Sequence, residues 1–277
     1  MRGPLARLLL WLGEAAGSLA FALGLRRAVA LDNLARAFPE LGEASRRSVA
    51  RAAYASLGRS LAEIALARRL SDAALEEQVR FEHFERYERA HAHGRGVVVA
   101  VAHFGNWELL ARAAARRGMP LTAITRRLSG RFNRWLVAAR REGGMRELPD
   151  KDATRDALAL LLRGETLAVI VDQNMLPRRG IFVDFFGAQA CTTPAAAVLS
   201  LRSGAPVVAA FPVRQPDGTH LVHFDGPFAA PAGARASEAV RALTQELTWA
   251  VERAVRAHPE QWFWVHRRWK TRPDGVG

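Results

Sequence analysis

The sequence has a single cysteine, Cys191, among 277 residues. One thiol excludes an intramolecular disulfide framework and a cysteine-based zinc cluster, and it suits a reducing compartment. Lysine is almost as scarce, because Lys151 and Lys270 are the only two, so arginine carries nearly all of the positive charge behind the formal net charge of +13. Such a surface suits an anionic partner, which is nucleic acid, anionic lipid or an acidic protein.

Several motifs that identify common enzyme classes are also missing. The sequence has no GxSxG nucleophile motif, no phosphate-binding glycine loop with its lysine, and no HExxH zinc motif. It has neither zinc-finger spacing nor a ribonucleoprotein aromatic motif, so we expect no nucleic-acid partner. Together with the histidine described in the next paragraph, these absences leave a histidine-based reaction that needs no covalent nucleophile, metal or nucleotide. Transfer of an acyl group to a hydroxyl fits, because a base can deprotonate the alcohol while nearby donors stabilise the oxyanion.

The chain is organised around residues 97–110, which read VVVAVAHFGNWELL. The β-branched run predicts a buried parallel strand, and the residues after Asn106 predict a helix. His103 then lies at the carboxyl end of a strand, where open α/β sheets place their chemistry. An imidazole there can act as a general base, and Glu108, about one helical turn into the next element, can orient it. The alternative is a structural histidine at a strand end.

The same spacing of a histidine and an acid occurs twice more in the sequence. His83 and Glu88 lie in a charged helical segment that we expect to be solvated. His220 and Asp225 lie in an alternating segment that predicts an edge hairpin. Only His103 follows a buried strand and meets a Gly-Asn turn, so the catalytic prediction concerns His103 and its own acid.

Alternation of helix and strand over residues 97–225 predicts an α/β fold with a single mixed, largely parallel sheet flanked by helices. Amphipathic helices at residues 28–40 and 45–69 and a third capped by Ser71 lead into this sheet. Residues 180–187, GIFVDFFG, are expected in the core. In the helix at residues 132–141 the expected inward side chains are Phe132, Trp135, Leu136 and Ala139.

Polar side chains follow three of the predicted strands. Arg126 follows the second of them, and Asp172 and Gln173 follow a later one. Carboxyl ends of parallel strands share one edge of a sheet, so these side chains should meet His103 in one crevice. We therefore predict two catalytic residues, His103 and Glu108, and four residues that bind substrate or stabilise an oxyanion, namely Asn106, Arg126, Asp172 and Gln173.

The two ends of the chain suggest contact with an anionic surface. Residues 5–25 are apolar enough to reach across a bilayer core, although Glu14 interrupts them. We predict that residues 1–27 form a helix that anchors the protein in or on a membrane, and that residues 28–277 form one catalytic domain. A buried core helix is the alternative. The aromatic tail from residue 259 is expected to dock on the sheet. The basic residues expected at lipid headgroups are Arg2, Arg7, Arg26 and Arg27, and the tail is expected to present Arg267 and Arg268 to an anionic surface.

Four blocks of the sequence, in order over residues 5–272, resemble the bacterial lipid A biosynthesis (late) acyltransferases. The fold that this resemblance implies is glycerolipid acyltransferase-like, similar to the lysophospholipid acyltransferases that carry an HX4(D/E) motif. The blocks are NLARAFPE, HFGNWE, VDQN with the following FVDFFGAQACTTPAAA, and the terminal PEQWFWVHRRWK.

The resemblance implies an enzyme on the cytoplasmic face of the bacterial inner membrane. It implies transfer of a fatty acyl chain from acyl carrier protein to a hydroxyl of an anionic glycolipid, usually a lipid A precursor, with no cofactor beyond that donor. His103 and Glu108 match the catalytic motif, and Arg126 and Asp172 match the family's arginine and aspartate. Where members often have Tyr-Arg-Pro this chain has Thr125-Arg126-Arg127, so its headgroup recognition can differ.

Three alternatives remain open at this point. One is an acyltransferase for another acceptor, such as a mannosylated phosphatidylinositol, a lysophospholipid or an aminoacyl lipid. Another is a membrane glycolipid-binding protein without turnover. A nucleic-acid binder would show steeply salt-dependent binding to DNA or RNA, and only the net charge supports it.

Overall fold

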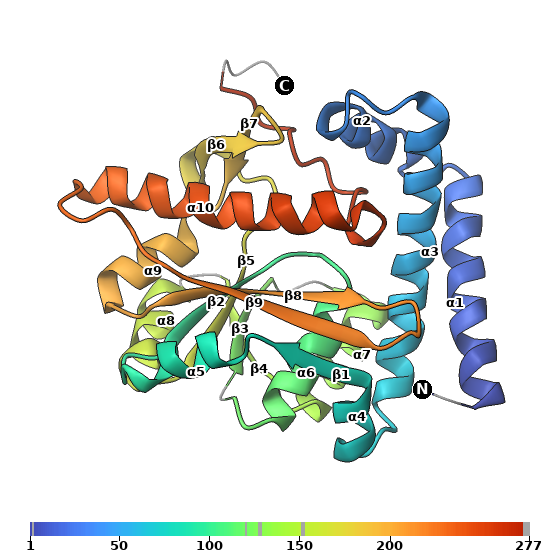
Figure 1. Ribbon diagram of the computed structural model, residues 1–277, viewed down its shortest axis with the longest axis horizontal. Coiled ribbons are helices and arrows are strands. Elements are labelled where there is room, and N and C mark those ends of the chain that lie inside the picture. The colour runs from blue at the N-terminus through green and yellow to red at the C-terminus, as the bar shows by residue number, and fades with distance from the viewer. Residues whose placement is uncertain (2, 120, 127–128, 151–152, 274–277) are drawn as a thin grey trace.

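The computed structural model describes residues 1–277 apart from residues 2, 120, 127–128, 151–152 and 274–277, so Arg2 and Arg127 lie outside the described residues. A seven-stranded sheet lies at its centre (Figure 1). Its strands run in the order β1 (Val79–Glu82), β9 (His220–Phe228), β8 (Val207–Arg214), β2 (Val97–Val101), β5 (Thr166–Ile170), β3 (Leu121–Thr125) and β4 (Arg146–Pro149).

Neighbouring strands pair in parallel except β8 and β9, which are antiparallel. The prediction of a single mixed, mostly parallel main sheet is therefore confirmed. The helices are α1 (Pro4–Ala22), α2 (Arg27–Ala37), α3 (Glu43–Ala67), α4 (Asp72–Gln78), α5 (Glu85–Ala92), α6 (Trp107–Arg116), α7 (Arg131–Glu142), α8 (Ala153–Leu162), α9 (Ala195–Ser203) and α10 (Ala236–Ala257), with 3₁₀ turns η1 (Pro177–Arg179) and η2 (Pro259–Gln261).

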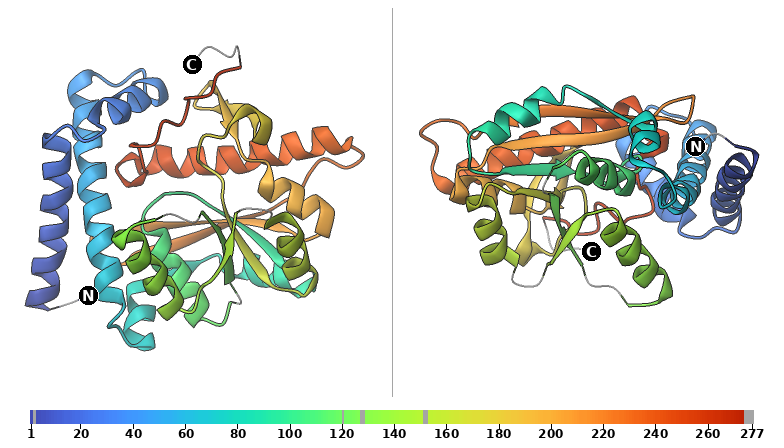
Figure 2. Two further views of the ribbon diagram at one scale, coloured as in Figure 1. Left: turned by 180° about the vertical axis from the view of Figure 1, so that it is seen from behind. Right: turned by 90° about the horizontal axis from the view of Figure 1, so that it is seen from below.

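Helices cover both faces of the sheet, as Figures 1 and 2 show from three sides. Every residue of β2 is buried, because alternate side chains enter two separate cores. Val98 packs in the core shared with α9 and α10, whereas Val99 packs in the core shared with α6. This double burial explains why β2 reads as an unbroken apolar run in the sequence.

The hairpin predicted at residues 220–225 is present, because β9 pairs with β8 in antiparallel orientation, but its predicted position at the edge of the sheet is wrong. Strand β9 is an inner strand, since β1 pairs with it in parallel on its other side. His220 is accordingly 1% exposed. The short segment VRFE that forms β1 ends in a charged residue and gives too little alternation to be recognised as a strand.

The segment at residues 180–187 is part of the core, as predicted. It forms the first strand and the turn of an antiparallel hairpin outside the main sheet, in which β6 (Ile181–Phe185) pairs with β7 (Ala188–Thr192). Phe185 is 1% exposed and packs against Trp262 and Trp269. The inward prediction for Phe132 is wrong, because that side chain is 58% exposed near the start of α7.

Helix α1 lies side by side with α3 along the edge of the molecule (Figures 1 and 2). Glycines permit this close approach, since a Cβ atom at Gly17 would lie 2.0 Å from the carbonyl oxygen of Tyr54, and one at Gly58 would lie 2.1 Å from that of Gly13. Among the described helices, α1 is the one long and apolar enough to cross a membrane.

Candidate active site

The loop at residues 103–106, called the His103 loop below, joins β2 to α6. Gly105 adopts a φ of +56°, and a Cβ atom there would lie 1.8 Å from the carbonyl oxygen of Pro212, so the turn requires glycine. Asn106 caps α6, because its side chain accepts a hydrogen bond of 3.1 Å from the backbone N–H of Leu109. The loop therefore fixes where α6 begins, four residues after His103.

Asp172 is the carboxylate that contacts the His103 ring. The His103 Nδ1 lies 2.9 Å from Asp172 Oδ1, and the His103 backbone N–H donates to Oδ2 at 2.9 Å. The register of β2 and β5 produces this contact, since Val101 is aligned with Ile170 and each functional residue follows two positions later. The two predicted strand ends thus meet as expected.

The aromatic tail completes the support of Asp172. The indole N–H of Trp262 donates to Asp172 Oδ2 at 2.8 Å, while the backbone N–H of Phe263 donates to the carbonyl of His103 at 3.0 Å. Phe104 and Trp262 form a β-bridge. The prediction that this tail docks on the sheet is confirmed, and its contacts attach it to the end of β2.

Asp172 is ionised at neutral pH. Burial alone would raise the pKa of its carboxyl, but the facing His103 and the hydrogen bonds from His103 and Trp262 lower that pKa below its ordinary value. The expectation that Arg268 faces an anionic surface is wrong, because it is 1% exposed. Its guanidinium donates to the Cys191 carbonyl and the Thr192 hydroxyl. Burial lowers the pKa of Arg268 to about 10, and the charge of Asp172 opposes that shift.

The second ring nitrogen of His103 faces polar and aromatic neighbours. Its Nε2 lies 3.3 Å from Gln173 Nε2, so a predicted site residue is at hydrogen-bond distance. The Trp107 ring meets the imidazole edge to face at 5.0 Å, and Phe263 lies 5.7 Å away. Because ionised Asp172 favours a proton on Nδ1, the Nε2 is the nitrogen able to accept one.

Glu108 has a different partner from the one that the HX4E spacing suggested. Arg140 binds its carboxylate with two hydrogen bonds of 2.8 and 2.5 Å, and the Trp107 indole donates to it at 3.1 Å. The expectation that Glu108 orients the imidazole is corrected here, because Asp172 makes that contact. Burial would lower the pKa of Arg140, but Glu108 and Glu147 raise it above its ordinary value.

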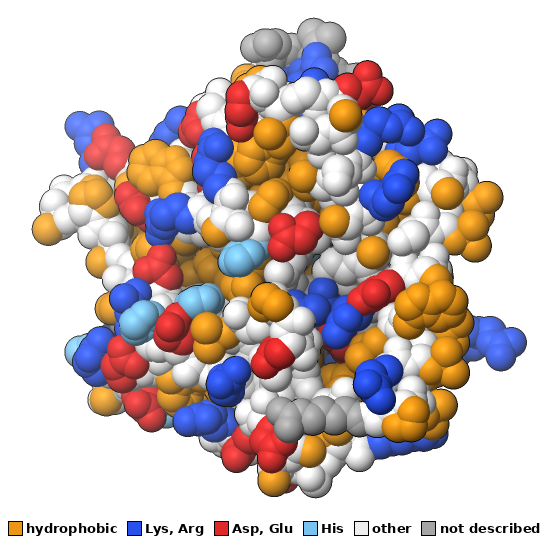
Figure 3. All heavy atoms as spheres, turned by 45° about the vertical axis from the view of Figure 1, so that its right-hand side comes forward, with side chains coloured by type: hydrophobic (Ala, Val, Ile, Leu, Met, Phe, Trp, Pro, Cys, Tyr) orange, Lys and Arg blue, Asp and Glu red, His pale blue; other side chains and the backbone are white. Residues whose placement is uncertain are grey.

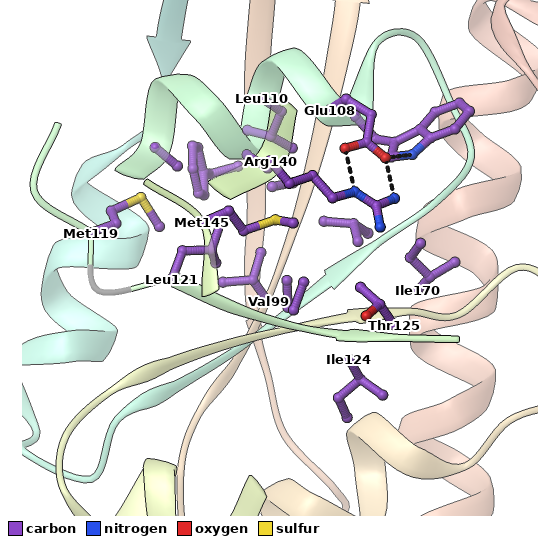
Figure 4. Close-up of a pocket in the computed structure, with 18 residues that line it drawn as sticks. Val99, Glu108, Leu110, Met119, Leu121, Ile124, Thr125, Arg140, Met145 and Ile170 are labelled. Atoms are coloured by element: carbon purple, nitrogen blue, oxygen red, sulfur yellow. Dashed lines mark hydrogen bonds and ion pairs between the residues drawn. The ribbon is translucent and has the colours of Figure 1, made fainter. Parts of the chain in front are cut away.

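An apolar pocket extends from this ion pair beneath α6. Figure 4 shows Glu108 and Arg140 facing each other at one end of the pocket and Met119 at the other. The pocket lies between α6 and the sheet, and apart from Glu108, Arg140 and Thr125 the residues that line it are apolar. The side chains drawn along it include Val99, Leu110, Leu121, Met145 and Ile170.

A second, smaller pocket includes His103 itself. It lies between α3 and the aromatic tail, and Tyr54, Leu57 and Phe263 contribute to its walls. Trp107 lines both pockets. His103 therefore lines the second pocket and contacts Trp107, whose ring also lines the apolar pocket.

Arg126 does not join this group. Its side chain is 73% exposed and its Nε lies 3.6 Å from Asp150 Oδ2. Asn106 is in the His103 loop but is turned inward, with a donor bond of 2.9 Å to Glu63. Of the predicted residues, the structure thus brings His103, Asp172 and Gln173 into one group and Glu108 beside it.

Sequence reasoning missed Trp262, Arg140 and Glu63. A tail reading QWFW was a usable signal for Trp262, since a buried indole N–H requires an acceptor. Arg140 and Glu63 contact the site from α7 and α3, and no spacing in the sequence links either to residues 103–108.

Comparison of the sequence with known proteins identifies a family that the chain matches. The sequence profile of the bacterial lipid A biosynthesis acyltransferases matches residues 6–271. A lipid A biosynthesis lauroyltransferase of Escherichia coli (strain K12) is 30% identical over 96% of this chain and 86% of its own length. The lipid A biosynthesis palmitoleoyltransferase of the same strain is 27% identical over 90% and 80%.

More distant similarity extends to another glycolipid acyltransferase. A phosphatidylinositol mannoside acyltransferase of Mycolicibacterium smegmatis (strain ATCC 700084 / mc(2)155) is 29% identical over 64% of this chain and 57% of its own length. The matched family covers the helical lead-in, the His103 loop, the end of β5 and the aromatic tail together. The chain belongs to the bacterial lipid A biosynthesis acyltransferase family.

Proposed function

We propose that this acyltransferase moves a fatty acyl chain from acyl carrier protein to a hydroxyl of a lipid A precursor, with His103 as the general base. The observation that carries the proposal is the His103–Asp172 pair beside an apolar pocket. A histidine oriented by an ionised carboxylate on one nitrogen has the other available for proton transfer.

In this proposal the Nε2 of His103 takes the proton of the acceptor hydroxyl as its oxygen attacks the thioester carbonyl carbon. A C–O bond forms, and the carbonyl oxygen becomes an oxyanion. The C–S bond then breaks, and the protonated imidazole returns the proton to the leaving thiolate. Asp172 stabilises the imidazolium that exists between these steps.

The first backbone amides of α6 are the proposed donors to the oxyanion. Helix N-terminal N–H groups lack intrahelical partners and favour negative charge. Asn106 caps only Leu109 among them through its side chain, which leaves the amides of Trp107 and Glu108 for this role. Glu108 remains a proposed catalytic residue, acting with Arg140 at the end of the pocket nearest His103.

The apolar pocket beneath α6 is the proposed site of the transferred acyl chain. Its walls carry no charge beyond the Glu108–Arg140 pair, and that pair lies at one end. An acyl chain gains hydrophobic free energy from such burial, at roughly 0.8 kcal/mol per CH₂ group. The space between α3 and the tail, which includes His103, is the proposed approach of the acceptor hydroxyl.

Arg126 is proposed to bind an anionic group of a substrate rather than the oxyanion. Its exposure and its loose contact with Asp150 leave the guanidinium accessible to a phosphate. The net charge of +13 would attract both an acidic carrier protein and an anionic lipid.

The exposed face of α1 is the proposed membrane contact. Figure 3 brings this side forward and shows apolar side chains gathered there with basic side chains among them. The opposite face packs on α3. The exposed apolar residues on and just after α1 are Leu5, Leu8, Leu9, Trp11, Leu12, Leu19, Leu23 and Leu25.

We propose that α1 lies in the plane of the membrane surface. It is about 28 Å long at about 1.5 Å per residue, which is close to the bilayer core thickness. Crossing the bilayer while packed on α3 would bring Arg47, Arg51 and the Glu14–Arg59 ion pair into hydrocarbon. An in-plane position on the cytoplasmic face avoids this cost.

Transfer of labelled acyl chains from acyl carrier protein to a panel of glycolipids tests the proposed function. The panel contains a lipid A precursor, a mannosylated phosphatidylinositol and a lysophospholipid, and each is tested with wild type and His103→Ala. We expect transfer to the lipid A precursor that the variant loses. Transfer to another acceptor alone would replace the lipid A precursor as the proposed acceptor. Lipid binding without transfer to any acceptor would contradict the enzyme assignment.

Labelling of new cysteines tests the position of α1. The lone Cys191 is buried, so Arg7→Cys and Arg26→Cys each add one accessible thiol near an end of α1. In sealed vesicles carrying the protein on the outside, a membrane-impermeant thiol reagent should label both variants. Labelling of only one end would show that α1 spans the bilayer.

A further inference from the structure

A cluster of buried charged side chains lies behind the His103 loop and takes no part in the chemistry proposed above. At its centre is Glu63 of α3, which is 1% exposed. Arg214 donates to its two carboxylate oxygens at 2.9 Å each, and the Nε2 of His220 lies 3.2 Å away. Burial alone would raise the pKa of Glu63, but His220 and Arg214 lower it well below its ordinary value, so Glu63 is ionised.

Glu63 contacts the His103 loop through Asn106. The Asn106 side-chain amide donates to Glu63 Oε2 at 2.9 Å and to the Ser60 carbonyl at 3.2 Å. The amide oxygen of the same side chain caps Leu109. Because Asn106 is 1% exposed, its orientation is determined by these protein contacts alone. Glu63 is therefore one of three groups, with the Ser60 carbonyl and the Leu109 N–H, that hold the orientation of the cap of α6.

A second route joins the cluster to the same loop. Gln261 accepts a hydrogen bond from the Arg214 backbone at 2.8 Å and donates to the Arg214 carbonyl at 3.0 Å. The backbone carbonyl of Gln261 accepts from Gly105 at 2.8 Å. The loop is thus connected on both sides to residues that Glu63 binds directly or through Arg214.

Stability alone is a weak reason for such a cluster. Removing several charges from water costs free energy that their mutual attraction often fails to exceed, and apolar residues can fill the same space. The contacts of Glu63 instead specify one geometry for Asn106, two positions before Glu108 and three after His103. A displacement of the helix start by about 1 Å is enough to reduce catalysis by about a hundredfold.

On the basis of the proposed acyl transfer, we propose that Glu63 is a positioning residue that acts through Asn106 to align His103 and the first amides of α6. It touches neither substrate nor the reacting atoms. Replacing Glu63 should therefore change kcat and the mobility of the His103 loop. The Glu63–Asn106 contact can be removed by substituting either residue.

A double-mutant cycle in the transfer assay tests this proposal. We expect Glu63→Gln to lower kcat roughly tenfold with KM for the acyl donor within about twofold of wild type. In an Asn106→Ala background, Glu63→Gln should lower kcat by clearly less than it does in wild type, because the direct contact is already absent and only the connection through Arg214 and Gln261 remains. If the double variant instead shows the product of the two single-variant losses of kcat, the two residues act independently and the proposal is overturned.

Glu165→Gln is the matched control. Glu165 is also a partly buried carboxylate with two arginine partners, Arg146 and Arg163, but it precedes β5 at the opposite edge of the sheet from Asp172. It should leave kcat unchanged. A loss of kcat in this control equal to that in Glu63→Gln would overturn the proposal, because any disturbed ion pair would then be sufficient.

Hydrogen exchange gives a readout that does not depend on activity. Backbone amides of residues 105–110 should exchange faster in Glu63→Gln, whereas those of β2 and β5 should not change. Asn106→Asp keeps an oxygen that can cap Leu109 but loses the amide N–H that donates to Glu63, so it provides the same measurement if Glu63→Gln does not fold. Unchanged exchange in the loop would contradict the positioning role even if the wild-type protein transferred acyl chains, and faster exchange would support it even if the acceptor panel gave no transfer.

Discussion

His103 with Asp172, and His220 with Glu63, form two histidine–carboxylate pairs that differ in what surrounds the second ring nitrogen. The His103 side chain is 16% exposed, and its Nε2 faces Gln173 and a pocket. His220 is 1% exposed, and its Nδ1 has no hydrogen-bond partner within the described part of the chain. One imidazole can exchange a proton with a bound molecule, whereas the other is enclosed.

The two carboxylates also differ in how their charge is balanced. Glu63 binds Arg214 and Arg59 as well as His220, so cations already neutralise it. Among the residues that the structure describes, Asp172 accepts hydrogen bonds from His103 and the neutral Trp262, so its charge can stabilise an imidazolium. A histidine beside an acid is therefore a base only where the second nitrogen is accessible and the acid is not already paired.

The largest effect should come from the same substitution made in both pairs. His103→Gln should lower acyl transfer by about 10²–10⁴-fold, the usual contribution of a general base. His220→Gln retains an amide that can reach Glu63, and should lower transfer less than about tenfold while destabilising the protein by about 1–3 kcal/mol. Single-turnover transfer and thermal unfolding measure the two effects. Equal losses of transfer would contradict the distinction.

Asp172→Asn should have the next largest effect. The amide has nearly the same shape but cannot stabilise the imidazolium, and its N–H₂ can favour the wrong tautomer of His103. We expect transfer to fall by about 10²–10³-fold with the fold retained. Asp156→Asn, on an exposed position of α8, is the control. Near-normal transfer in Asp172→Asn would contradict the proposal that Asp172 orients the His103 imidazole.

Glu108→Gln separates a chemical role from a structural one. Replacing the carboxylate weakens a buried two-point contact with Arg140, so transfer should fall by about 10–10²-fold. The double variant Glu108→Gln/Arg140→Met removes the cation that has lost Glu108 and that, among the described residues, keeps Glu147 as a carboxylate partner. If Glu108 takes part in the reaction, this second change does not restore transfer. Recovery to near wild-type rates would show that Glu108 serves only to pair Arg140.

A third histidine, His266, should affect how the stability of the protein depends on pH. Burial lowers the pKa of His266 to about 4, and its Nε2 accepts from the Asn174 backbone, so it is neutral in the folded protein. The unfolded chain binds a proton below about pH 6.5, so stability should fall as pH decreases from about 6.5 to 4. His266→Gln, which offers an oxygen acceptor, should show a smaller fall in Tm over that window. An identical fall would contradict this assignment.

The smallest effect is expected at Arg126. Because its side chain is mostly exposed, Arg126→Ala should raise KM for the glycolipid about two- to tenfold and leave kcat unchanged. The difference from wild type should shrink at high salt, since exposed charges are screened. A large loss of kcat would return Arg126 to the oxyanion role considered from the sequence.

Much of the fold followed from the sequence because its signals are local. The buried run at residues 97–101, the helix after Asn106 and the cap at Ser71 all appear where the pattern predicted them. The strand β1 and the inner position of β9 were missed, because four residues carry too little periodicity and strand order depends on contacts between distant segments.

The partner of His103 also depends on contacts between distant segments rather than on a local sequence signal. Spacing favoured Glu108, five positions away, although Asp172 lies 69 positions further along the chain. Pairing of β2 with β5 in one register is what aligns the two strand ends. Glu63, Asn106, Arg214 and His220 likewise have no short-range pattern in common.

The sequence by itself determined most of the helices and strands, the family and the residue types available at the strand ends, because backbone preference and burial pattern act over a few residues. Only the tertiary structure decided that Asp172 rather than Glu108 contacts His103, that Arg268 is buried and that Glu63 supports Asn106. Those choices depend on strand order and helix packing, which bring together side chains that the chain itself keeps far apart.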